Sequence, residues 1–96
     1  MNMDVYVWLD DIREAPYGYV WVKSVNQAKK VIKELEELGF TIFLDLDHDL
    51  GDYAADGGDG IKLVDWLDET GRHYLTKLHT MNPVGRQNMQ AIIDRW

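Results

Sequence analysis

The chain has 96 residues, of which 46% are hydrophobic and 28% charged, and it contains no cysteine. These values are ordinary for one soluble globular domain spanning residues 1–96, and they exclude a disulfide framework and a thiolate metal site. The net charge of −7 argues against general binding of nucleic acid through a basic surface.

Two strands separated by a loop are predicted at the start of the chain. Asp4 to Leu9 and Tyr19 to Lys23 are rich in β-branched and aromatic residues, which favours strands. The residues between them include a proline and a glycine and show no helical period, so this segment is predicted to be a loop.

A helix is predicted to follow the second strand. Ser24 and Gln27 match a capping box, in which the two side chains satisfy free backbone N–H groups. Apolar residues then recur at helical spacing until Gly39, which is typical of the residue after a helix end.

The stretch from Phe40 to Gly51 is the most informative part of the sequence. Its apolar run predicts a strand buried on both faces, and the run ends in Asp45, Asp47, His48 and Asp49. Neighbouring carboxylates raise one another's pKa unless a cation or hydrogen-bond donors compensate. We therefore predict a metal- or phosphate-handling site at the carboxyl end of this strand.

The remaining residues, 52–96, are predicted to form a loop, two helices and an edge strand. Asp52 to Gly58 is an acidic, glycine-rich loop, and Asp59 is expected to cap the helix that follows. Leu75 to Met81 is a less apolar strand, expected near a sheet edge. Asn82 and Pro83 then match the N-cap and first position of a last helix.

This order of elements predicts an α/β domain. Strands that alternate with helices imply right-handed crossovers and a parallel sheet. We expect a truncated three-layer, receiver- or flavodoxin-like fold with about four parallel strands in the order 2-1-3-4 and helices on both faces.

The carboxyl ends of parallel strands open on one rim, where ligands of such folds bind. We predict a Mg²⁺ or Mn²⁺ site there, because hard cations take carboxylate oxygens; its candidate ligands are Asp10, Asp11, Asp47 and Asp49. His79 is the leading candidate for proton transfer, supported by His48, with Asp47 at the centre of the catalytic group. Asp45 lies one pleat deeper and has no assigned role.

A phosphate group is expected beside the metal. Free N–H groups and the positive dipole end at the start of the last helix attract anions. The candidate phosphate-binding residues are Arg13, Thr80, Asn82, Gly85 and Arg86.

Simpler interpretations compete with each of these residues. Asp10 and Asp11 could be turn residues, and a single histidine is more often structural than catalytic. Asp45 to Asp56 has aspartates at EF-hand positions, but position 6 is Leu50 where that loop needs glycine. Residues 44–47 also resemble the nucleophile motif of haloacid-dehalogenase-type phosphatases.

The sequence predicts a cytoplasmic protein with no membrane segment. Its amino terminus lacks a signal-peptide pattern, and no apolar run approaches the roughly 20 residues that cross a bilayer. The oligomeric state is open.

Four ordered motifs together resemble the cyclic-phosphate-processing receiver-like domain family, a divergent relative of response-regulator receiver domains. They are LDDIREAP (9–16), LDHDLG (46–51), DG (59–60) and HTMNPVGRQNM (79–89). The resemblance implies that Asp10 and Asp11 bind Mg²⁺, that Asp47 matches the phosphoryl acceptor of receivers, and that Thr80 matches the Ser or Thr that ends their fourth strand. The first helix and the fifth strand of receivers have no counterpart in this sequence, which argues against phosphorylation by a kinase.

The function that we expect is metal-assisted processing of a phosphoester, with a cyclic phosphate on a nucleotide or RNA end as substrate. The alternative is a non-catalytic receiver-like module that senses a phosphorylated ligand or binds a partner protein.

Overall fold

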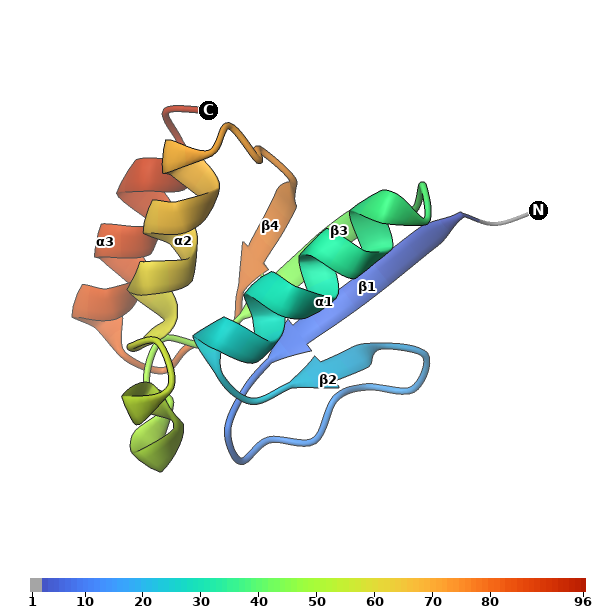
Figure 1. Cartoon of the computed structure of the whole chain (residues 1–96). Coiled ribbons are helices and arrows are strands. Elements are labelled where there is room, and N and C mark those ends of the chain that lie inside the picture. Colours follow the sequence, from blue (N-terminus) through green and yellow to red (C-terminus); the bar gives the residue numbers. More distant parts are fainter. Residues whose placement is uncertain (1–2) are drawn as a thin grey trace.

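A computed structural model describes residues 3–96 and contains a four-stranded sheet with three helices (Figure 1). The elements in chain order are β1 (Asp4–Leu9), β2 (Val20–Val22), α1 (Val25–Glu37), β3 (Thr41–Leu46), the short 3-10 helix η1 (Gly51–Ala55), α2 (Gly60–Glu69), β4 (Leu75–Leu78) and α3 (Pro83–Ile93).

The sheet is parallel, and its strand order is β2-β1-β3-β4. This confirms the predicted α/β, flavodoxin-like arrangement and places β4 at an edge, as expected from its lower apolar content. In the register, Trp8 on β1 and Lys77 on β4 lie on either side of Asp45 on β3. The three strands therefore end close together at one rim of the sheet.

The structure differs from the prediction in how the faces of the sheet are covered. Along β3, buried Ile42, Leu44 and Leu46 alternate with more exposed residues, so this strand is fully buried on one face and not on both. The buried strand residues join one core cluster with residues of all three helices, and α2 contacts both α1 and α3. The helices therefore form one layer on one face of the sheet.

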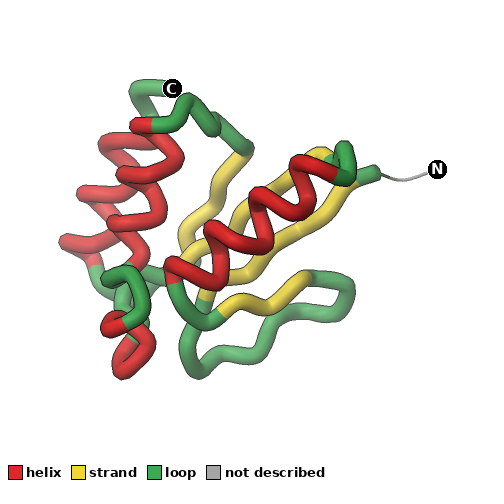
Figure 2. Tube along the Cα trace, viewed as in Figure 1, coloured by secondary structure: helices red, strands yellow, loops and turns green. Residues whose placement is uncertain are grey.

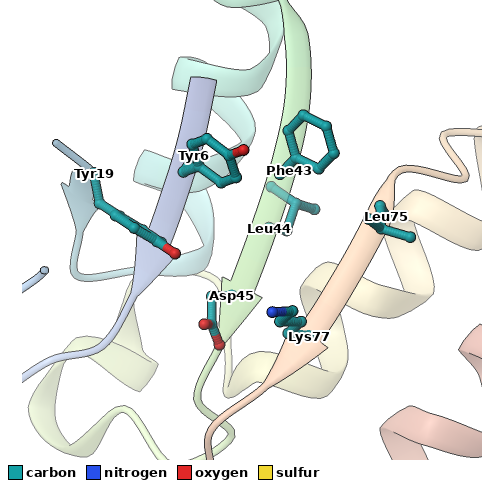
Figure 3. Close-up of a pocket in the computed structure, with 7 residues that line it drawn as sticks. All are labelled: Tyr6, Tyr19, Phe43, Leu44, Asp45, Leu75 and Lys77. Atoms are coloured by element: carbon teal, nitrogen blue, oxygen red, sulfur yellow. The ribbon is translucent and has the colours of Figure 1, made fainter. Parts of the chain in front are cut away.

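We call the other side of the sheet the open face; it carries Tyr6, Trp8, Phe43, Asp45, Leu75 and Lys77. Figure 3 looks onto this face, with the helices behind the strands. The chain between β1 and β2, drawn as loop in Figure 2, reaches this face, because the Trp8 indole N–H donates to the Arg13 carbonyl at 2.9 Å. A loop thus lies where the prediction expected a helical layer.

Local capping explains where the helices begin. The Ser24 hydroxyl accepts from the Gln27 N–H at 3.1 Å, as predicted, while the Gln27 side chain accepts from the N–H of Lys23 instead of Ser24. Asn82 caps α3 by accepting from the Gly85 N–H at 3.0 Å. Asp59 precedes α2, but its carboxylate accepts from the Leu50 N–H instead of capping the helix.

The segment predicted as an acidic loop overlaps a 3-10 turn, η1, and Asp56 at the end of this turn accepts from the Ser24 hydroxyl at 2.6 Å. Within residues 3–96, no helix combines the length and the apolar character needed to span a bilayer.

Candidate functional site

Three strands deliver one side chain each to a compact cluster at the rim. Asp10 follows β1, Asp47 follows β3 and His79 follows β4, and their ligand atoms all lie within 4.8 Å of one another. Counted in steps of two along each strand, these residues continue the series of side chains that point to the open face. The parallel topology therefore brings together three of the residues singled out from the sequence.

Asp10 is the most buried acid of the cluster, with 3% of its side chain exposed. Burial alone raises its pKa, but the N–H groups of Arg13 and Ile12 donate to Oδ1, and His79 contacts Oδ2 at 3.0 Å. These bonds outweigh burial and hold the pKa of Asp10 below its ordinary value. Asp10 is therefore an anchored carboxylate with Oδ2 facing the cluster.

The pKa of Asp47 moves in the opposite direction. Burial raises it, and the negative charge of Asp10 adds to this rise. The His48 N–H, at 2.8 Å from Oδ1, and the buried Thr80 hydroxyl donate to the carboxylate and compensate in part. A cation between Asp47 and Asp10 would relieve the remaining repulsion.

His79 is held on three sides. Its Nδ1 lies 2.8 Å from Asp45 Oδ1 and its Nε2 lies 3.0 Å from Asp10 Oδ2. The Trp8 indole stacks on the imidazole, with ring centroids 3.7 Å apart and an interplanar angle of 3°. Asp45 thus bonds a site residue, which sequence reasoning did not identify.

A second group, formed by His48, Asp49 and Asp59, lies beside the first. Asp49 contacts His48 Nδ1 at 2.8 Å and accepts from the Asn82 side chain at 3.2 Å. A Cβ added to Gly85 would meet the His48 ring at 2.5 Å. The structure therefore gives Gly85 a packing contact with His48, and gives Asn82 a capping and bridging position.

The cluster opens into a depression of about 400 Å³. Its lining includes Asp10, Asp11, Arg13, Asp47 and Asp49. The Arg13 guanidinium donates to the His79 carbonyl at 3.4 Å, so one cationic group stands beside the acids.

The other arginine predicted to bind phosphate lies elsewhere. The Arg86 guanidinium donates to the Thr80 carbonyl at 3.0 Å, and Arg86 lines a separate depression on the outer side of α3. The structure thus places Arg13, and not Arg86, in the depression that holds the acids.

Gly60, in the first turn of α2, packs closely against the backbone of Asp47. Gly60 is buried, and an added Cβ would lie 2.1 Å from the Asp47 carbonyl oxygen. We expect Gly60→Ala to destabilise the domain by roughly 1–3 kcal/mol, the usual effect of overpacking. Thermal unfolding measures this as a fall in Tm of about 4–8 °C per kcal/mol for a domain of this size.

Gly85→Ala is the matched variant, because there the added Cβ meets a side chain, the His48 ring, and not backbone. A smaller loss of stability than for Gly60→Ala is expected. Equal Tm values for wild type and Gly60→Ala would contradict the tight backbone contact.

The sequence did not identify Asp45 and Trp8 as site residues, because the residues that they contact come from other strands. Asp45 and Trp8 lie side by side across β1 and β3, and His79 follows the register partner of Asp45 by two residues. Once a 2-1-3-4 sheet was predicted, alternation along the strands was the signal that could have placed all three on one face.

Comparison with known protein families matches residues 5–95 to the cyclic-phosphate processing receiver domain. The match covers nearly the whole chain and agrees with the parallel sheet and the rim cluster, and the protein belongs to this family. Neither the curated proteins nor the solved structures contain a significant match.

Proposed function

We propose that this domain processes a phosphoester with the help of a bound divalent metal ion, and that its substrate is a cyclic phosphate on a nucleotide or RNA end. The observation that supports this most directly is the cluster of Asp10, Asp47 and His79 beside Arg13. Membership of a cyclic-phosphate processing family supports the substrate class.

The donor set suits a metal ion of the transition series. Asp10 Oδ2, an Asp47 oxygen and His79 Nε2 would hold the ion. Mg²⁺ prefers oxygen ligands alone, whereas Mn²⁺ also accepts imidazole, so Mn²⁺ fits this set better. The ion would supply Lewis-acid polarisation of a phosphoryl oxygen.

The residues around the ion would bind and orient the substrate. The Arg13 guanidinium would bind the phosphate, and Asp11 and Asp49 would hold water at the mouth of the depression. The contact of Nδ1 with Asp45 turns Nε2 of His79 toward Asp10 and Asp47, which favours a ligand role for this residue over the proton transfer predicted from the sequence. His48 remains the candidate for a supporting proton transfer, because within residues 3–96 only one of its ring nitrogens, Nδ1, contacts a carboxylate.

The test is turnover of 2′,3′-cyclic nucleotides by the whole domain. We expect product to form with Mn²⁺ and none to form once the metal ion is chelated. Chromatography of the nucleotides measures the product. If calorimetry shows tight binding of the cyclic nucleotide but no product forms, the domain is a sensor of phosphorylated ligands and not an enzyme. Neither binding nor turnover across a broad phosphoester panel would overturn the proposal.

A further inference from the structure

The open face of the sheet holds a cavity of about 220 Å³ (Figure 3). Pockets that enclose a whole drug-sized ligand measure roughly 300–1,000 Å³. This cavity is smaller, and its size suits one planar ring system rather than a whole ligand of that kind. Its lining consists of Tyr6, Tyr19, Phe43, Leu44, Asp45, Leu75 and Lys77.

One wall of this cavity is a row of aromatic rings. Tyr6 lies between Tyr19 and Phe43, with ring centroids 5.3 Å from the first and 4.9 Å from the second, and it is stacked on Phe43. Tyr6 is 39% exposed and Leu75, on the opposite strand, is 68% exposed. Tyr6 and Phe43 each cover one ring face of the other, and the wall is a partly exposed aromatic surface outside the core cluster.

Two charged groups complete the cavity. Asp45 and Lys77 are register partners on β3 and β4, and both line it (Figure 3). A carboxylate acceptor and an ammonium donor beside an aromatic wall match the donors and acceptors on the edge of a nucleobase. A purely aliphatic ligand would use neither charged group.

The cavity and the rim cluster share a wall. Asp45 lines the cavity and contacts His79 Nδ1 at 2.8 Å, and His79 Nε2 contacts Asp10 at 3.0 Å. Asp45 and His79 therefore connect the cavity to the cluster, so the two sites are neighbours at the same rim.

We infer that the cavity binds the nucleobase of the cyclic nucleotide, stacked against Tyr6 and Phe43, while the cyclic phosphate lies at Asp10, Asp47 and His79. This inference rests on the proposed function and assigns a binding site to the base of that substrate. Aromatic side chains on a sheet surface are a common platform for single bases. The net charge of −7 argues against recognition of a longer strand, because it provides no basic track along which the strand could bind.

The experiment compares a nucleotide with its base-free analogue. Adenosine 2′,3′-cyclic phosphate and methyl β-D-ribofuranoside 2,3-cyclic phosphate are titrated with Mn²⁺ into wild type, Tyr6→Leu and Tyr53→Leu, without allowing turnover. Tyr53, on η1, is the matched control because it is 38% exposed and lies outside the cavity. A short RNA ending in a 2′,3′-cyclic phosphate is the third probe and separates an RNA end from a free nucleotide.

We expect Tyr6→Leu to weaken adenosine 2′,3′-cyclic phosphate at least roughly fivefold, the lower range for loss of one base–aromatic stack. The base-free analogue should bind all three proteins equally, and NMR signals of the Tyr6 and Phe43 rings should shift only with the nucleotide. The more tightly bound of nucleotide and RNA identifies the source of the base.

Three results would overturn the inference. Equal nucleotide affinity of wild type and Tyr6→Leu, with the analogue still bound, would reject the base site and leave the proposed function standing. A loss of self-association in Tyr6→Leu, without a change in nucleotide affinity, would assign the open face to a second copy of the chain. If no probe binds, both the proposed function and this inference fail.

Discussion

Asp47→Asn is expected to abolish metal-dependent turnover of 2′,3′-cyclic nucleotides while the domain stays folded. The substitution removes one carboxylate from the three-residue cluster. Even residues that only support metal ligands change affinity by roughly 10–100-fold when mutated, so loss of a ligand is expected to exceed this range. Calorimetric titration with Mn²⁺ and a turnover assay measure the two effects.

The same substitution is expected to leave the stability unchanged or to raise it. Burial and the charge of Asp10 raise the pKa of Asp47 in the folded state. Above this pKa the folded domain must hold an ionised carboxylate that the unfolded chain solvates better, so removing the charge favours folding near neutral pH. In acid Asp47 is protonated in both states, and the advantage should disappear.

Asp52→Asn serves as the control, because Asp52 is an exposed acid on η1 outside the lining of the depression. It is expected to keep wild-type metal affinity and turnover. Turnover by Asp47→Asn at the wild-type rate would contradict the placement of this residue at the centre of the site.

The strand order and the rim were predictable because they depend on local patterns. Helical spacing, the Ser24 and Asn82 caps and the apolar strands define the alternation of elements, and right-handed crossovers then leave few arrangements. The absence of a helical layer on the open face was not predictable in this way. Phe43 and Tyr6 are as bulky as their core neighbours, so hydrophobicity alone could not show that one face lacks a helical layer.

Within the site, the sequence identified the residues at strand ends and missed those that need a register. Asp10, Asp47 and His79 follow three different strands, and a parallel sheet brings any such residues together. The partner of His79 depends on which residues pair across β3 and β4, which no local pattern specifies. Asp45, predicted without a role, therefore emerged only from the three-dimensional structure.

Asp45→Ala is expected to lower the affinity for Mn²⁺ roughly 10–100-fold, although Asp45 is not itself in the three-residue cluster. An ionised carboxylate only accepts hydrogen bonds, so its contact with His79 Nδ1 keeps the proton on that nitrogen and turns Nε2 toward the cluster. Without Asp45, the imidazole loses this orientation and a mostly buried N–H loses its partner, which costs about 1–3 kcal/mol of stability.

Asp45→Asn and Lys77→Gln separate this positioning role from a general loss of stability. The amide oxygen of asparagine can still accept from Nδ1, so Asp45→Asn is expected to recover much of the affinity that alanine loses. Lys77→Gln replaces the register partner of Asp45 and leaves the contact between Asp45 and His79 in place. The affinity of this variant for Mn²⁺ should therefore match that of the wild type. Nitrogen-15 spectra of the His79 ring report the proton on Nδ1 directly, and should change in Asp45→Ala alone. Unchanged ring spectra and unchanged Mn²⁺ affinity in Asp45→Ala would show that Trp8 stacking is enough to orient His79.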